Sequence, residues 1–396
     1  MKSSGNDSVA LSTRKIAIVS APCLNNAGML SVDYAALEFF ENLGLANIPD
    51  IYVAQPTPYL KPLILIPRFA KYTIKPSSIR FAGTQRARLL RSNSQLSAYD
   101  VIIFWGDFIN NPAFGLGDFS GRDVRWGYSR TRAEAFSRWR SLFCGNGLGD
   151  RLLISAGNNF QNNFDKVEHQ EALRDIFDNF SFIFPRDEYS TEKLLSLRAD
   201  ASKTVVECGM DMAFLQRGRT SQPQNSFSYF FFRSKLVGME KLIAQISKTT
   251  NLNGRELKGW LSLPNLSLDR TFQRLRQQIS ESRFVITDTY HVAVNSMNLG
   301  VPVFCIGRPV EAQNGTVGDF KKKELFRMLG LKKMYFESKD TESDITVVER
   351  LPTAILPHVQ NSFAAFAVPY KQIAQRSSAF EHRIIEVLYN SVQRNR

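Results

Sequence analysis

The sequence predicts an α/β protein made of two facing, Rossmann-like doubly wound domains with a ligand-binding cleft between them. Three observations support this prediction. Short apolar stretches alternate with helical segments, the alternation restarts after a polar stretch near the middle, and 396 residues are enough for two domains. Because ligands of such folds bind at the carboxyl ends of the strands, candidate site residues are sought there.

The first half of the chain contains four apolar stretches typical of buried strands. They are 15–20, 100–105, 151–155 and 180–184. A loop with asparagine and glycine follows the first stretch, and Ser31 is placed to cap a helix that runs to Leu43. Another helix, 190–197, follows the fourth stretch. Strand, loop and helix in this order are the start of a doubly wound sheet.

Alternation of strands and helices restarts in the second half. We expect strands at 228–232, 259–263, 284–287 and 301–306, and helices at 236–249, 270–282, 289–299 and 379–392. The predicted organisation is a disordered tail (1–14), an N-terminal Rossmann-like domain (15–216), a linker (217–227) and a C-terminal Rossmann-like domain (228–396). The last helix can pack back on the first domain.

Composition restricts the partners and the location of the protein. Lysine and arginine exceed aspartate and glutamate by 13, which indicates an anionic partner such as phosphate, acidic polysaccharide, nucleic acid or lipid head groups. The four cysteines are widely spaced, as expected of buried free thiols in a reducing compartment. Since no apolar stretch approaches the roughly 20 residues that span a bilayer, we expect a soluble, cytoplasmic protein.

His291 is the main catalytic candidate. In the segment 287–291 (TDTYH) a predicted strand ends and a helix begins, and the free N–H groups of a first helical turn attract anions. A histidine there can give a proton to a phosphate or take one from a sugar hydroxyl. Asp288 can orient the ring or cap the helix. The alternative is a histidine that only caps or packs.

Arg186 is the second candidate, in the segment 185–195 (PRDEYSTEKLL) between a buried strand and a helix capped by Ser190. Its planar guanidinium can clamp a phosphate or a carboxylate. The alternative is a surface ion pair with Asp187 or Glu188.

Weaker candidates lie at other strand ends. Residues Asn25, Asn26 and Gly28 can present backbone amides to a ligand or form an ordinary turn. Trp105 and Asp107 end the second strand at the same sheet edge, and Asn158 follows the third strand. A basic cluster, with a solvated charged face as its alternative, comprises Lys321, Lys322, Lys323, Arg327, Lys332 and Lys333.

Taken together, these segments resemble the polysaccharide pyruvyl transferase family. The resemblance is spread over most of the chain. It rests on 25–28, 100–107 (DVIIFWGD), 154–159 (ISAGNN), 185–194, 208–214 (CGMDMAF), 287–303 and 321–331. It implies a fold similar to the two-domain GT-B glycosyltransferases. It also implies transfer of a pyruvyl group from phosphoenolpyruvate to two hydroxyls of a glycan or lipid-linked sugar, which forms a ketal and releases phosphate.

The resemblance also implies residue roles. His291 matches the acid/base histidine, and Arg186 matches an arginine that contacts the donor. Around them we expect donor contacts from Asp288, Thr289 and Tyr290. The family often has arginine where this chain has Thr289, so another cation, Arg308, Arg283 or Arg233, is expected to replace it. The first loop likewise has Met29 where the family tends to carry aspartate.

Two other functions stay open at this point. One is a GT-B-like glycosyltransferase that uses a nucleotide sugar, which Thr289 slightly favours. The other is a non-catalytic protein that binds an anionic glycan. The expected partners are phosphoenolpyruvate as co-substrate and a sugar or oligosaccharide acceptor of exopolysaccharide or cell-envelope synthesis. Peripheral contact with the anionic inner face of a membrane is compatible with the charge, whereas nucleic acid, a metal and a cofactor are not expected.

Overall fold

The computed structural model describes most of the chain, and all statements below concern those residues. They are 14–20, 26–43, 49–55, 79–80, 82, 86–218, 221–232, 239–264, 267–307, 317–337, 344–360 and 362–393. They divide into two compact units. Unit 1 comprises the described residues within 1–23, 36–212 and 380–396, and unit 2 those within 24–35 and 213–379. The units interleave along the chain, whereas the predicted domains are continuous in sequence.

Unit 1 contains an eight-stranded sheet in the order β3-β4-β2-β1-β5-β6-β7-β8. Its strands are β1 (Ile16–Ser20), β2 (Asp50–Val53), β3 (Ile79–Arg80), β4 (Arg86–Leu89), β5 (Val101–Asp107), β6 (Leu152–Asn158), β7 (Phe182–Pro185) and β8 (Val205–Val206). All neighbours pair in parallel except β3 and β4. The central strand β1 is buried along its whole length, as expected of a parallel sheet covered on both faces.

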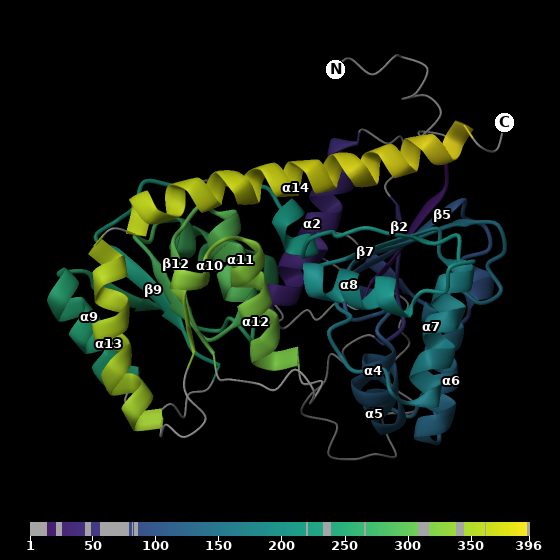
Figure 1. Cartoon of the computed structure of the whole chain (residues 1–396), viewed down its shortest axis with the longest axis horizontal. Helices are drawn as coiled ribbons and strands as arrows, with labels where there is room; N and C mark the ends of the chain where they lie inside the picture. The colour runs from purple at the N-terminus through teal and green to yellow at the C-terminus, as the bar shows by residue number, and fades with distance from the viewer. Residues whose placement is uncertain are drawn as a thin grey trace. The chain divides into compact units, whose positions relative to one another are not determined.

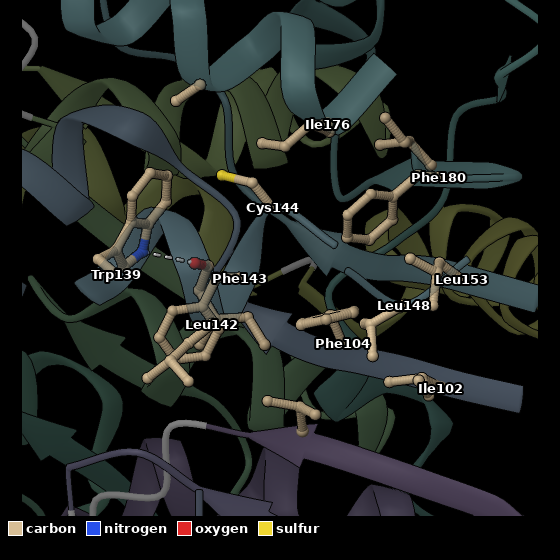
Figure 2. Packing of buried hydrophobic residues seen from close by; sticks show 14 of the residues in the cluster. Ile102, Phe104, Trp139, Leu142, Phe143, Cys144, Leu148, Leu153, Ile176 and Phe180 are labelled. Atoms are coloured by element: carbon tan, nitrogen blue, oxygen red, sulfur yellow. Dashed lines mark hydrogen bonds between the residues drawn. The ribbon is translucent and has the colours of Figure 1, made fainter. Parts of the chain in front are cut away.

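The helices of unit 1 cover an aromatic core. They are α4 (Pro112–Phe114), a π-helix (Gly115–Phe119), α5 (Ser120–Arg125), α6 (Arg132–Phe143), α7 (Val167–Asn179) and α8 (Glu188–Leu197). Figure 2 shows how Trp139 and Phe143 of α6 lie among side chains of the sheet such as Phe104. The buried indole of Trp139 donates a hydrogen bond to the carbonyl of Ile109 at 2.9 Å, which satisfies its polar atom.

Unit 2 contains a five-stranded, fully parallel sheet in the order β10-β9-β11-β12-β13. Its strands are β9 (Ser226–Phe230), β10 (Asn253–Glu256), β11 (Val285–Thr287), β12 (Val303–Gly307) and β13 (Tyr335–Glu337). Its helices include α9 (Met239–Thr250), α10 (Leu268–Ser280), α11 (Tyr290–Asn298), α12 (Val317–Met328) and α13 (Asp344–Gln360), labelled in Figure 1. The predicted α/β class with two parallel sheets is thereby confirmed.

Helices α2 (Ala27–Asn42) and α14 (Ser362–Gln393) each contribute residues to both units. The first residues of α2, up to Ala35, belong to unit 2, and the rest belong to unit 1. The end of α14 from Phe380 onward belongs to unit 1.

None of the helices in the described ranges combines the length and apolar character that crossing a bilayer requires.

Several predicted elements differ from the observed ones. Helix α2 begins at Ala27, so Ser31 lies inside it and does not cap it. The strand expected at 259–263 is a turn, because the edge strand of this sheet is the polar stretch β10, which a search for apolar runs overlooks. Strand β9 begins at Ser226, inside the predicted linker, and the predicted tail lies outside the described residues except for Arg14.

The cysteines follow the expectation only in part. Cys144 and Cys305 are buried free thiols, and burial raises the pKa of Cys305 to about 12. Cys208, by contrast, is exposed. Cys23 lies outside the described residues.

A buried histidine of α7 makes the stability of unit 1 depend on pH. His169 is 5% exposed, and neither ring nitrogen has a hydrogen-bond partner among the described residues. Burial, and then the charge of Lys166, lower the pKa of His169. The unfolded chain therefore takes up this proton more readily than the folded one, so the contribution to stability is full above about pH 6.5 and is lost as the pH falls.

We predict that His169→Leu flattens this dependence. When the pH falls from about 7 to 5, the free energy of unfolding should decrease more for the parent protein than for the variant, because leucine takes up no proton. Urea unfolding at each pH measures this free energy. The matched control is His382→Leu at an exposed position, which should keep the parental slope. Equal slopes for the parent and His169→Leu would contradict the prediction.

Candidate functional site

The segment around His291 forms the start of α11 in unit 2, as predicted. Strand β11 ends at Thr287 and α11 begins at Tyr290, so His291 lies in the first turn. Thr289 occupies the N-cap position with an extended backbone, and its side chain does not cap the helix. The amide of Thr289 donates instead to the hydroxyl of Thr287 at 3.0 Å.

Asp288 fastens the loop before α11 to the neighbouring strand. Its carboxylate accepts a hydrogen bond from the amide of Phe232, just after β9, at 2.7 Å. The same oxygen accepts the hydroxyl of Thr289 at 3.0 Å. Asp288 therefore does not occupy the capping position that the sequence allowed for it, and it joins the carboxyl ends of β9 and β11.

His291 itself is 8% exposed and lies between its neighbour Tyr290 and the start of α2. The rings of Tyr290 and His291 meet edge to face, with centroids 5.2 Å apart. On the α2 side, the backbone of Gly28 approaches the ring directly. The backbone amide of Gly28 donates to the side-chain oxygen of Asn26 at 2.9 Å. It is therefore not available to a ligand, although the sequence had allowed it. Asn25 lies outside the described residues.

Lys322 of α12 is a buried cation beside this segment. It is 3% exposed, and its ammonium donates to the carbonyls of Asp288 at 2.7 Å and Ile306 at 3.1 Å. It also forms an ion pair with Asp319. Lys322 thus ties the carboxyl ends of β11 and β12 together, and the solvated-face interpretation is wrong for this member of the basic cluster.

Lys321 is a cation with a partly exposed side chain beside the start of α11. Its ammonium lies 5.0 Å from the centre of the Tyr290 ring. Of the arginines expected to replace the one missing at Thr289, Arg283 is exposed and precedes β11, at the opposite end of the strand from His291. Arg233 and Arg308 lie outside the described residues.

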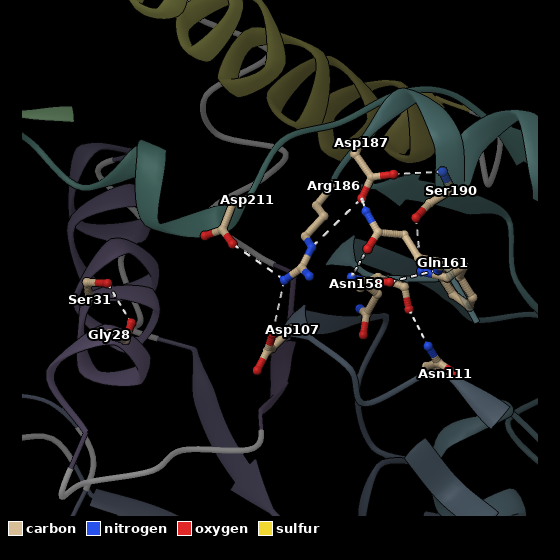
Figure 3. Close-up of polar contacts among 12 residues, drawn as sticks. Gly28, Ser31, Asp107, Asn111, Asn158, Gln161, Arg186, Asp187, Ser190 and Asp211 are labelled. Carbon is tan, nitrogen blue, oxygen red and sulfur yellow. Dashed lines mark hydrogen bonds and ion pairs between the residues drawn. The ribbon is translucent and has the colours of Figure 1, made fainter. Parts of the chain in front are cut away.

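In unit 1, Arg186 lies at the end of β7 and is 1% exposed. Its guanidinium lies 3.1 Å from Asp107, 3.7 Å from Asp211 and 3.9 Å from Asp187, as Figure 3 shows. The ring of Phe108 lies below it at 5.3 Å. The interpretation as a surface ion pair is therefore wrong, because this arginine is a buried cation surrounded by three carboxylates.

Asp107 reaches Arg186 through an unusual backbone turn at the end of β5. Gly106 and Asp107 both have positive φ, at 80° and 54°. Aspartate is one of the few side chains that tolerate this conformation. The side chain of Asp107 keeps 11% of its surface exposed, so it is the most accessible carboxylate around Arg186.

The other polar residues at this sheet edge are bonded to one another. Asn158 is fully buried and bonds to Ser155 and to the backbone of Asn110. Asp187 caps α8 by accepting the amide of Ser190 at 2.7 Å, so Ser190 is not the cap that the sequence indicated. These bonds stabilise the loops that follow β5, β6 and β7 (Figure 3).

Trp105 is part of the core of unit 1. It is 1% exposed, and its ring lies against Phe39 and Phe40 of α2, with centroids 5.6 and 5.9 Å away. The ring of Trp105 therefore has no exposed surface on which an acceptor sugar could bind.

Each unit therefore offers a different chemistry. In unit 2, a histidine in the first turn of α11, with Lys321 beside Tyr290, can transfer a proton next to a bound anion. In unit 1, the three carboxylates compensate the charge of Arg186. Sequence reasoning missed Asp211 and the role of Lys322. The sequence signal for Asp211 was its place inside CGMDMAF (208–214). The signal for Lys322 was the run of three lysines at 321–323, which follows the predicted strand 301–306.

Comparison with known proteins gives one family and several distant structures. The chain matches the family described as polysaccharide pyruvyl transferase over residues 34–309, well over half of its length. No curated protein is similar enough in sequence to count as a match.

Among the similar structures is an uncharacterized protein of Klebsiella pneumoniae (14% identity, TM-score 0.43, 84% of this chain and 95% of that one). Another is HepE of Anabaena in complex with UDP and glucose (14%, 0.42, 95% and 100%). A third is UDP-GlcNAc 2-epimerase of Neisseria meningitidis bound to UDP-GlcNAc (12%, 0.45, 94% and 100%).

We predict that Arg186→Ala lowers the free energy of unfolding by about 3–5 kcal/mol, because removal of one partner leaves buried carboxylates uncompensated. Arg186→Lys should lose less, since it keeps the charge. The control is Arg383→Ala in the same unit. It breaks a half-exposed pair with Glu207 and should cost about 1 kcal/mol or less. Chemical denaturation of the three variants measures the difference, and equal losses for both alanine variants would contradict the prediction.

Proposed function

Because the chain belongs to the polysaccharide pyruvyl transferase family, we propose that it transfers a pyruvyl group from phosphoenolpyruvate to two hydroxyls of one sugar. The products of this reaction are a cyclic ketal and phosphate. The proposed acceptor is a glycan or a lipid-linked sugar of exopolysaccharide or cell-envelope synthesis. The net charge of +13 favours an anionic donor, and it also favours contact with acidic head groups at the cytoplasmic face of a membrane.

The position of His291 carries this proposal. The reaction needs a proton on the methylene carbon of the enolpyruvate, which makes the neighbouring carbon an oxocarbenium-like centre. A first sugar hydroxyl adds to that carbon and gives up its proton. Phosphate then leaves with its bonding electrons, and the second hydroxyl closes the ring and loses its proton. We expect protonated His291 to supply the first proton and neutral His291 to accept one from a hydroxyl.

The phosphate of the donor needs positive charge beside it. The first turn of α11, to which His291 belongs, supplies backbone N–H groups that can bind an anion. We assign the missing arginine's role to Lys321, because its ammonium lies 5.0 Å from the Tyr290 ring at the start of α11 and its side chain is partly exposed. Arg186 stays a predicted donor contact, although its charge is compensated by carboxylates.

The test of the acid/base role is His291→Ala. Phosphate release from phosphoenolpyruvate in the presence of acceptor sugars should fall by about 10²–10⁴-fold, the usual contribution of a positioned acid or base. His382→Ala, at an exposed position, is the control and should keep full activity. Parental rates in His291→Ala would remove the histidine from the mechanism.

The donor itself is tested by thermal unfolding with candidate ligands. Phosphoenolpyruvate should raise the unfolding midpoint, because a ligand that binds only the folded state stabilises it. A nucleotide sugar such as UDP-glucose should not. The reverse result would favour the glycosyltransferase alternative and would contradict the proposed donor.

The role of Lys321 predicts a change in binding. Lys321→Ala should raise the KM for phosphoenolpyruvate about tenfold or more, as expected for loss of an interaction with a charged group. The matched control is Lys323→Ala on the same helix, whose ammonium pairs with Glu337 at 3.0 Å on an exposed face. Equal KM values for the two variants would exclude Lys321 as the donor cation.

A further inference from the structure

We infer that Gly28 is a positioning residue for His291. Because this position has no side chain, the first turn of α2 can lie directly against the imidazole. The backbone of that turn then restricts the positions that the ring can occupy. This inference rests on the proposed function for its catalytic consequence, but its structural part can be tested without any reaction.

The contact between Gly28 and His291 leaves no room for a methyl group. A Cβ atom at position 28 would lie 2.4 Å from the Cβ of His291 and 2.7 Å from both its Cγ and its Nδ1. Carbon atoms that do not share a bond attract at about 3.5–4.0 Å and repel well inside that distance. Because the Cβ of His291 is fixed to its backbone, a larger residue at position 28 must displace the start of α2 or the start of α11, and with it the ring of His291.

The reason for glycine here is space and not backbone conformation. Gly28 lies within α2, and it is not among the glycines of positive φ. The backbone conformation at position 28 therefore does not require glycine, and the close approach to His291 accounts for it.

The start of α2 is fastened to unit 2 and cannot easily retreat. The contacts that hold it link backbone, hydroxyl and amide groups. They are Ala27 N to Trp260 O (2.8 Å), Asn295 Nδ2 to Ser31 Oγ (3.1 Å) and Tyr34 OH to Asp269 Oδ1 (2.7 Å). Tyr34 also stacks on Phe272, with the ring centroids 5.2 Å apart.

Asn295 closes this network onto α11 itself. Its amide donates to the carbonyl of His291 at 2.8 Å as well as to the hydroxyl of Ser31. The helix that carries His291 and the helix that carries Gly28 are therefore joined one turn below their point of contact. A methyl group at position 28 would therefore strain these joined helix starts and displace His291, its ring included.

The first test is kinetic. Gly28→Ala should lower kcat by about 100-fold, the cost of misplacing a reacting group by about 1 Å. The KM for phosphoenolpyruvate should change little, because the cation and the helical N–H groups remain. The control is Gly117→Ala in unit 1, where an added Cβ meets no atom within 4 Å, and which should keep parental kinetics. A Gly28→Ala variant with parental kcat would overturn the inference.

The second test does not need the reaction. The chain has four histidines, so ring ¹⁵N resonances of a histidine-labelled sample can be followed individually. Gly28→Ala should shift the His291 ring signals and leave those of His358 and His382 in place. Unchanged His291 signals would overturn the inference.

A double-mutant cycle completes the design. Gly28→Ala should destabilise the parent protein but not the His291→Gly variant, which lacks the Cβ, Cγ and Nδ1 atoms that the added methyl group would meet. The same loss in both backgrounds would mean that Gly28 acts independently of His291. If phosphate release is absent from the parent protein, the proposed function fails, whereas the signals and the cycle still decide whether Gly28 positions His291.

Discussion

A buried positive charge organises the carboxyl edge of the larger sheet. Arg186 is almost entirely removed from water, and an uncompensated charge there would cost several kilocalories per mole. Three carboxylates meet this demand, each from a different segment of the chain: the end of β5, the start of α8 and the stretch after β8. The paths of these loops, and the amide network between them, are consequences of that one requirement.

The smaller sheet also has a buried cation at its carboxyl edge, and polar groups compensate its charge. Lys322 is buried beside Asp319, and its remaining N–H groups satisfy two carbonyls at the ends of neighbouring strands. This arrangement fixes the backbone immediately before α11. His291 therefore owes its position to Lys322, which holds the backbone before α11, and to the start of α2, which lies against it. A helix start that is held from two directions is a suitable place for a proton-transfer group.

The sequence was sufficient for the fold class, the order of most strands and the first-turn position of His291, because these depend on local apolar patterns. It was not sufficient for Gly28, whose role depends on a contact with a residue far along the chain. Nor could it separate Lys322 from Lys321, since adjacent lysines look alike until the helix orients one inward. Trp105 shows the opposite error: its place at a strand end suggested a ligand contact, but its size made it a core residue.

The polar strand β10 has a consequence for how this protein behaves among its own copies. It forms an edge of the smaller sheet, and an open edge offers backbone groups to which a strand of another molecule can add. Its sequence, NGRE, places Arg255 and Glu256 along that edge, and charged side chains oppose such pairing. The polar composition that hides this strand from a search for apolar runs is thus also a composition that opposes pairing with another strand at this edge.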